Sequence, residues 1–95
     1  MIKTFKDPET ERIFAGLTSK RLPADIQTRA LRKLRMIDQS TCVEDLRMPP
    51  GNRFEALLGD RAGSFSIRIN DKWRICFLWD GSDAYDVEIT NHYGR

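Results

Sequence analysis

Two arginines, Arg68 and Arg74, occupy the positions in this sequence that most directly suggest chemistry. Each lies where apolar and polar residues alternate, in the segments 65–69 and 73–77. Alternation with a period of two indicates β-strands with one buried face, and it places both arginines on the opposite, open face. Like charges that face each other destabilise a sheet, and a guanidinium is well suited to bind phosphate. The pair therefore predicts a phosphate-bearing partner.

The alternative is that these arginines only keep an exposed strand soluble and discourage edge pairing, which is the better explanation for any single one of them. The neighbouring charges favour binding instead, because Arg61 precedes the two strands and Lys72 lies in the turn between them. The formal net charge of the 95 residues is only +2. Any contact with nucleic acid is therefore expected to be a local patch.

The turn between the two strands determines which residues face each other. A two-residue loop would pair Ile69 with Arg74 and mix the two faces. A three-residue loop at 70–72 pairs Ile69 with Trp73 instead. It also pairs Arg68 with Arg74. The hydrophobic pattern favours the three-residue loop, because a slip of one residue would turn every side chain to the other face.

The only histidine, His92, follows the last expected strand, 85–89. The expected register of that strand pairs Trp79 with Tyr85, Phe77 with Val87 and Arg74 with Thr90. The same parity places His92, together with Asn91 and Tyr93, beside the arginine pair. A lone histidine near a terminus is more often an idle surface residue, but this position favours a general acid or base that works near neutral pH.

The elements that must position these residues form one small α+β domain over residues 1–95. Besides the two strands that carry the arginines, the sequence predicts a short strand at 1–5, a helix that Asp7 caps and Gly16 helps to end, a helix from Pro23 to about Asp38, and strands at 54–58 and 85–89. The two N-terminal helices are expected to pack on one face of a twisted antiparallel sheet, with Tyr85 pointing inward.

The second helix has an apolar stripe at helical spacing, made of Ile26, Ala30, Leu31, Leu34 and Ile37. Four basic residues lie largely off this stripe, namely Arg29, Arg32, Lys33 and Arg35. This basic face is expected to be a solvated surface. The alternative is a flank that contacts RNA or a partner protein.

Composition argues against several classes of protein. Charged residues make up 32% and aromatic residues 9% of the chain, which is not typical of disorder. No apolar run approaches the roughly 20 residues of a membrane span, and the N-terminus lacks a signal-peptide pattern. Cys42 and Cys76 form no CxxC pair, which together with a single histidine disfavours zinc. We expect a cytoplasmic protein with reduced thiols, no metal and no contact with membranes.

Five stretches of the sequence carry a more specific pattern: PPGNRFEAL at 49–57, GDRAG at 59–63, SIRIN at 66–70, WRICF at 73–77 and DVEI at 86–89. Together they resemble the HigB-type killer toxins of bacterial toxin–antitoxin systems, within the wider RelE/ParE toxin superfamily. The resemblance covers essentially the whole chain, and residues 59–77 are its most specific part.

The resemblance implies a compact, microbial-RNase-like (RelE-like) fold with a concave sheet face. Members of the family cut messenger RNA in the ribosomal A site, without metal or cofactor, and so inhibit translation. A small helix-turn-helix antitoxin, HigA-like, neutralises them, and operator DNA is bound only through the toxin–antitoxin complex. Because one fold supports several functions, the alternative is a growth inhibitor of the ParE type, which is non-catalytic or directed at DNA gyrase.

The chain departs from the family pattern at two places that bear on catalysis. Relatives carry a histidine in the strand before Gly-Asp-Arg, where this chain has Glu55. They end in Asp-Tyr-His, where this chain has Asn91-His92-Tyr93. Either the acid–base roles pass to different residues, or the enzyme is weak.

Metal-free RNA cleavage by attack of the 2′-OH needs a base, an acid and fixed positive donors. The predicted catalytic residues are His92, Tyr93, Arg74, Arg68 and Glu55. The predicted RNA- and phosphate-binding residues are Arg61, Lys72, Arg53 and Asn91. His92 and Glu55 both remain candidates for the base. With so small a net charge, ribosomal RNA is expected to provide much of the binding.

Overall fold

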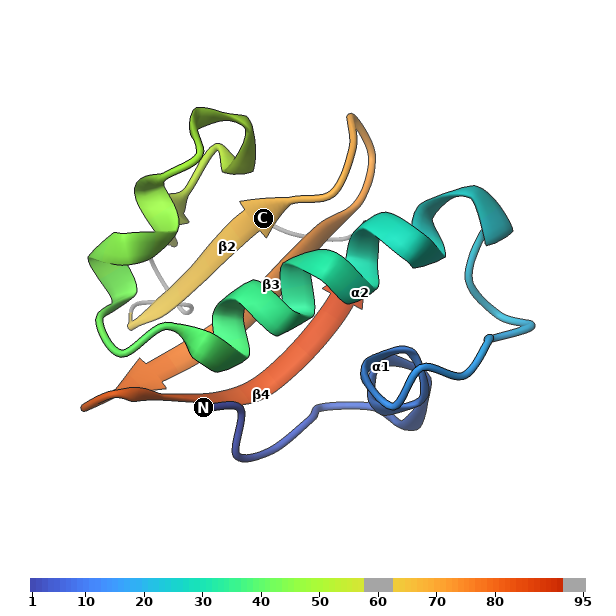
Figure 1. Ribbon diagram of the computed structural model, residues 1–95, viewed down its shortest axis with the longest axis horizontal. Coiled ribbons are helices and arrows are strands. Elements are labelled where there is room, and N and C mark those ends of the chain that lie inside the picture. The colour runs from blue at the N-terminus through green and yellow to red at the C-terminus, as the bar shows by residue number, and fades with distance from the viewer. Residues whose placement is uncertain (58–62, 92–95) are drawn as a thin grey trace.

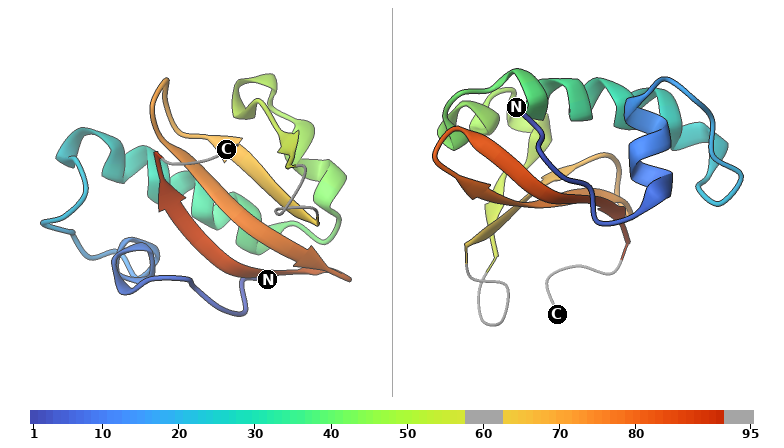
Figure 2. Two further views of the ribbon diagram at one scale, coloured as in Figure 1. Left: turned by 180° about the vertical axis from the view of Figure 1, so that it is seen from behind. Right: turned by 90° about the horizontal axis from the view of Figure 1, so that it is seen from below.

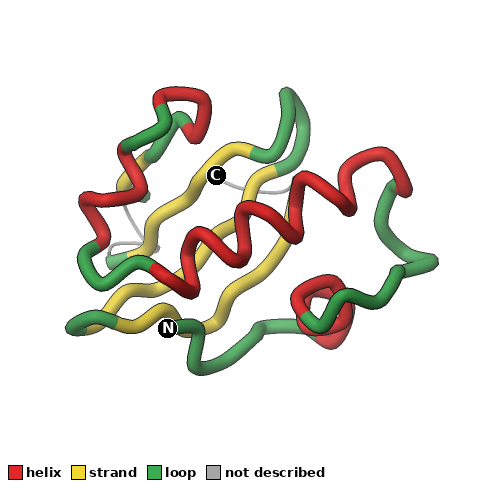
Figure 3. Tube along the Cα trace, in the orientation of Figure 1, coloured by secondary structure: helices red, strands yellow, loops and turns green. Residues whose placement is uncertain are grey.

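The computed structural model describes residues 1–57 and 63–91. Its elements, in chain order, are α1 (Pro8–Phe14), α2 (Ala24–Gln39), the short 3-10 helices η1 (Val43–Arg47) and η2 (Pro50–Asn52), and the strands β1 (Glu55–Ala56), β2 (Ser64–Arg68), β3 (Arg74–Asp80) and β4 (Asp83–Thr90). The strands form one antiparallel sheet in the order β1-β2-β3-β4 (Figures 1 and 3). The α+β class, with two N-terminal helices, is confirmed.

The first helix is bounded by the residues that the sequence indicates. Asp7 is the N-cap, and its Oδ1 accepts a hydrogen bond of 2.8 Å from the backbone N–H of Thr10. Past the C-terminal end, Gly16 adopts φ 85°, a left-handed conformation that favours glycine. Its N–H donates to the carbonyl of Ile13 at 3.0 Å. This bond closes the last turn and satisfies one carbonyl that the helix itself leaves unpaired.

The right-hand view of Figure 2 shows α2 lying across one face of the sheet. The core lies between the two. The predicted stripe of α2 provides its helical side, because all of its residues except Leu31 are buried and Leu31 is half-buried. Strand residues of the opposite parity to the arginines provide the other side, including Ile67, Ile75, Phe77 and Val87. No helix within the described residues is long and apolar enough to cross a membrane.

The hairpin between β2 and β3 has the predicted three-residue loop. Arg68 pairs with Arg74 in the sheet register, and the N–H of Ile69 donates to the carbonyl of Trp73 at 2.8 Å. The side chain of Asn70 fixes the loop, because its Oδ1 accepts the backbone N–H groups of residues 72 and 73, each at 2.8 Å. Both arginines consequently belong to the face opposite α2.

The register between β3 and β4 is only partly as predicted. Arg74 pairs with Thr90, but Trp79 pairs with Ala84 and not with Tyr85. A β-bulge causes the difference: between Cys76 and Leu78 the register shifts by one residue, and Asp86 takes φ 51°. The bulge turns Ala84 into the core, where it is fully buried. The expectation that Tyr85 points inward is therefore wrong.

Two expected strands are shorter than predicted. The segment 1–5 makes only isolated parallel bridges to β4, at Ile2 with Ala84 and at Phe5 with Val87. The segment 54–58 contributes the two residues of β1, and Leu58 lies outside the described residues. One edge of the sheet, β4, is thus bordered by the irregular segment 1–5, and the other edge is the two-residue strand β1.

Candidate active site

Arg74 lies at the centre of the predicted site, but it does not face outward as predicted. It is only 5% exposed. Its Nε donates to Oγ of Ser66 at 2.8 Å, and its Nη2 donates to the Ser66 carbonyl at 3.1 Å and to the Arg53 carbonyl at 2.5 Å. Parity gave the correct face of the sheet. Arg53 and Glu55, which precede and begin β1, are among the contacts of Arg74.

Glu55 reaches this arginine from the neighbouring edge of the sheet. It pairs with Ser66 in the register of β1 and β2, so its side chain lies on the arginine face. Its Oε1 is 3.2 Å from Nη2 of Arg74, and its side chain is 56% exposed. The site thus combines a carboxylate that solvent or a substrate can reach with a guanidinium that is fixed behind it.

Arg68 is the more open of the two paired arginines. Its side chain is 30% exposed, and its Nη2 forms an ion pair with the carboxylate of Asp71 in the hairpin loop. Each of the facing arginines therefore has an acidic partner, Asp71 for Arg68 and Glu55 for Arg74. Their mutual repulsion is offset within the chain, so it does not by itself require a bound anion.

The remaining predicted residues fall into two groups. Lys72 and Asn91 are exposed at the hairpin loop and directly after β4, and Arg53 is exposed before β1. Arg53 contacts the site through its backbone carbonyl, and its left-handed conformation, with φ 43° and ψ 55°, sets the direction of that carbonyl. The other three, Arg61, His92 and Tyr93, lie outside the described residues. The structure thus brings together Glu55, Arg68 and Arg74.

Two neighbours of these residues were missed in the sequence. Ser66 is fully buried and holds Arg74 through both its hydroxyl and its carbonyl. It has the same parity as Arg68 on β2, which is the signal that could have identified it. Asp71 lies in the predicted loop three residues after Arg68, and that spacing is a recognisable sign of an ion pair across a tight turn.

Among the described residues, His, Cys, Asp and Glu side chains form no group of three that could hold a metal ion.

Lys33 contradicts the expected solvated face of the second helix. The other three basic residues of that face are exposed, but Lys33 is 8% exposed. Its Nζ donates to Oδ1 of Asn52 in η2. Burial lowers the pKa of the Lys33 ammonium, and the nearby cations of Arg32, Arg29 and Arg68 lower it further. The sequence pattern did not reveal this residue, because its partner comes from a distant loop.

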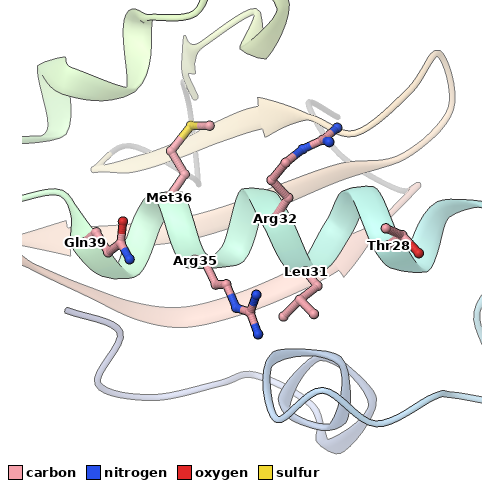
Figure 4. A pocket seen from close by; sticks show the side chains of 6 residues that line it. All are labelled: Thr28, Leu31, Arg32, Arg35, Met36 and Gln39. Carbon is pink, nitrogen blue, oxygen red and sulfur yellow. The ribbon is translucent and has the colours of Figure 1, made fainter.

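A separate hollow of about 510 Å³ runs along α2. It is lined by Thr28, Leu31, Arg32, Arg35, Met36 and Gln39. Figure 4 shows these side chains on both sides of the helix, with Arg32 and Arg35 extending in opposite directions. The hollow contains none of the predicted catalytic residues, so it is distinct from the group around Arg74.

Comparisons with known proteins place this chain in a family. Residues 3–93 match the family described as the RelE-like toxin of the type II toxin–antitoxin system HigB. The chain is 38% identical over 93 residues to Toxin HigB-1 of Vibrio cholerae, which covers 97% of this chain and 98% of that protein. It is 30% identical over 93 residues to Endoribonuclease HigB of Proteus vulgaris, which covers 98% of this chain and 100% of that protein.

A solved structure supports the fold. The YoeB/ParE toxin from Agrobacterium tumefaciens superposes with a TM-score of 0.58 at 19% identity, over 96% of this chain and 99% of that one. The predicted RelE-like fold is confirmed, and the family implies a cognate antitoxin as partner. The chain belongs to the HigB-like family of RelE-like toxins from type II toxin–antitoxin systems.

Proposed function

We propose that this toxin is an endoribonuclease that cleaves messenger RNA on the ribosome and so inhibits translation. The observation that carries the proposal is the contact between Glu55 and Arg74, with Oε1 3.2 Å from Nη2, on the sheet face that also holds Arg68. A relative that is 30% identical over nearly the whole chain is named an endoribonuclease, which supports the same reaction class.

The proposed reaction is transesterification by the 2′-OH without a metal. The 2′-oxygen loses its proton and forms a bond to the adjacent phosphorus, while the bond from phosphorus to the 5′-oxygen breaks and that oxygen gains a proton. Glu55 and His92 are the candidates for the base that accepts the first proton, and Tyr93 or His92 can supply the second. Negative charge on the non-bridging oxygens is stabilised by fixed cationic donors.

The two arginines have different proposed roles, because they differ in exposure. Arg68, with a side chain that is 30% exposed, can meet a phosphate directly. Arg74, with a side chain that is 6% exposed, acts mainly by holding the carboxylate of Glu55 in place. This division refines the sequence-based prediction, in which both arginines were open to substrate.

Binding of the substrate relies on the ribosome. The candidate phosphate contacts are Lys72, Arg53, Arg61 and Asn91, and the net charge of +2 provides little attraction for free RNA. We therefore propose that ribosomal RNA contributes much of the binding and that the toxin acts in the cytoplasm. We propose that the cognate antitoxin is of the HigA-like, helix-turn-helix type and that operator DNA is contacted only through the complex.

The test of this function is a translation reaction with a defined messenger. The 5′ ends of the messenger are mapped by primer extension after incubation with the toxin, with and without ribosomes. Cuts in phase with codons that appear only with ribosomes are the expected result. Inhibition of DNA supercoiling without any cut would instead assign the protein to gyrase, and ribosome association without cleavage would make it a binding module.

The test variant and its matched control are two substitutions of glutamate. Glu55→Gln removes the carboxylate beside Arg74, and Glu44→Gln removes a carboxylate of similar exposure, 58% against 56%, that pairs with Arg47 in η1. Cleavage should fall only in the first variant. For the antitoxin, co-expression with the neighbouring open reading frame should give one peak on size exclusion and restore growth.

A further inference from the structure

Asn52 is a fully buried polar side chain that joins three elements on the helical side of the sheet edge. Its Oδ1 accepts from Nζ of Lys33 in α2. Its Nδ2 donates to the carbonyl of Leu46 in η1 at 3.1 Å and contacts Sδ of Met36 at 3.1 Å. The amide therefore fixes η2, and the backbone that follows it, relative to α2.

The ammonium of Lys33 is an unusual partner for this amide. Lysine is almost never buried unless it is paired. Here the hydrogen-bond acceptor is a neutral amide, and the cations Arg29, Arg32 and Arg68 are near enough to lower the pKa of the ammonium. An apolar residue at this position would avoid the cost of desolvating a charge. The hydrogen bond between Lys33 and Asn52 is therefore not explained by stability alone, and we consider what it positions.

The positional consequence runs through the next residue. Arg53 follows Asn52 and has φ 43° and ψ 55°, a left-handed conformation in which the turn dictates the direction of its carbonyl. Its N–H donates to the carbonyl of Pro50 at 3.0 Å. Its own carbonyl accepts from Nη2 of Arg74 at 2.5 Å. The same Nη2 lies 3.2 Å from Glu55 and 3.1 Å from the Ser66 carbonyl, so the Arg53 carbonyl is one of the acceptors that fix the guanidinium beside this carboxylate.

We propose that Lys33 and Asn52 are positioning residues for the active site: they hold the turn 50–53 so that the Arg53 carbonyl clamps Arg74, and Arg74 in turn orients Glu55. Their effect on catalysis rests on the proposed nuclease function. Their effect on the position of Arg74 does not, and the two can be measured separately.

The first measurement follows Arg74 directly and needs no RNA. In the ¹⁵N spectrum of arginine side chains, the Nε–H of Arg74 is expected to exchange slowly with water, because it is buried and bonded to Ser66. Lys33→Met should speed this exchange by about tenfold or more through local opening, while backbone amides of β3 stay protected. Lys20→Met makes the same chemical change at an exposed lysine and should leave the exchange unchanged.

The second measurement is cleavage on translating ribosomes. Lys33→Met should lower kcat on the order of 10- to 100-fold, the effect of a small misplacement of catalytic groups, with KM nearly unchanged. If the wild-type toxin cleaves no RNA, the nuclease function fails, and the exchange of the Arg74 Nε–H still decides whether the pair positions Arg74.

A double variant separates position from stability. Lys33→Met with Asn52→Leu replaces both buried polar side chains by apolar ones. The free energy of unfolding of this variant is measured beside its activity, because the Leu46 carbonyl also loses its donor. If the pair is a positioning device, this folded protein should still show fast exchange at Arg74 and a low kcat. A double variant that matches the wild type in exchange and in kcat overturns the proposal, and so does Lys33→Met with an unchanged Arg74 signal.

Discussion

The carboxylate of Glu55 and the guanidinium of Arg74 meet at the edge of the sheet, 3.2 Å apart, yet only one of them is open to solvent. The Glu55 side chain is 56% exposed and that of Arg74 is 6% exposed. An exposed partner of an ion pair contributes little to folding, whereas a buried guanidinium that loses its acceptors costs much more. Substitutions on the two sides of this contact should therefore have different consequences.

Glu55→Gln should act on cleavage and hardly on folding. The free energy of unfolding should change by about 1 kcal/mol or less, as for other exposed ion pairs. If Glu55 is the base, the rate of cleavage should fall by about 10²- to 10⁴-fold. Urea denaturation and primer extension measure the two effects. Glu44→Gln provides the reference, and equal cleavage by both variants would remove Glu55 from the mechanism.

Arg74→Ala should lower both the rate of cleavage and the stability of the fold. The substitution leaves the Ser66 hydroxyl and the Arg53 carbonyl without their donor, and the loss of hydrogen bonds to a charged group costs about 1.5–3 kcal/mol. Arg47→Ala, at a side chain that is 59% exposed, serves as the comparison. Denaturant midpoints should separate the two variants clearly. Equal midpoints would show that the buried contacts of Arg74 do not contribute to stability.

The buried lysine predicts a dependence of stability on alkaline pH. In the folded protein the pKa of Lys33 lies below the ordinary lysine value of 10.5, because of burial first and then of Arg32, Arg29 and Arg68. Between the two values the unfolded chain binds more protons than the folded one, so the free energy of unfolding rises with pH in that window. Below the folded value the cost of charging Lys33 is present in full.

The Lys33→Met variant has no ammonium at this position, so it lacks the cost of keeping a buried lysine charged. The stability of the wild type relative to Lys33→Met should therefore increase as the pH is raised toward the ordinary lysine value of 10.5. Denaturation curves at several pH values measure the difference, with Lys20→Met as the control that should run parallel to the wild type. Parallel curves for Lys33→Met as well would show that Lys33 is not held in an unfavourable charged state.

His92→Gln tests the second candidate for proton transfer. If the imidazole is the acid or base, cleavage by the wild type should change with pH over about 6–7, and the variant should lose that dependence together with most of its rate. A rate that keeps its pH profile in His92→Gln assigns the proton transfer elsewhere. Combining it with Glu55→Gln shows whether the two residues act in one step, because residues that act as a unit are not additive.

Local patterns predicted the parts of the fold that depend on neighbouring residues. The hairpin with Asn70 in its loop follows from the alternation of the two strands and from the loop length that keeps their faces matched. The cap at Asp7 and the end of the helix at Gly16 follow from the preferences of single residue types. The same alternation correctly predicted the face of the sheet on which Arg68 and Arg74 lie.

Features that depend on distant partners were not predictable in this way. The buried Arg74 contacts a carbonyl and a carboxylate from residues about twenty positions earlier, and the buried Lys33 contacts an amide from η2. The bulge at Asp86 adds one residue to β4, and no glycine in that strand indicates it in the sequence. The partner of Trp79 therefore differs from the expected one. Parity identifies a face, but only packing determines which residues on it remain exposed.

The covered edges of the sheet restrict how a neutralising partner can attach. On β4, backbone hydrogen bonds of 2.8–3.1 Å link Ala84 and Val87 to residues 1–6, and on the other side β1 is two residues long. Within the described residues, neither border presents the long row of unpaired N–H and C=O groups that strand addition uses. An antitoxin that extended this sheet would first have to peel away one of these segments. Binding through side chains, on a surface left folded, requires no such displacement.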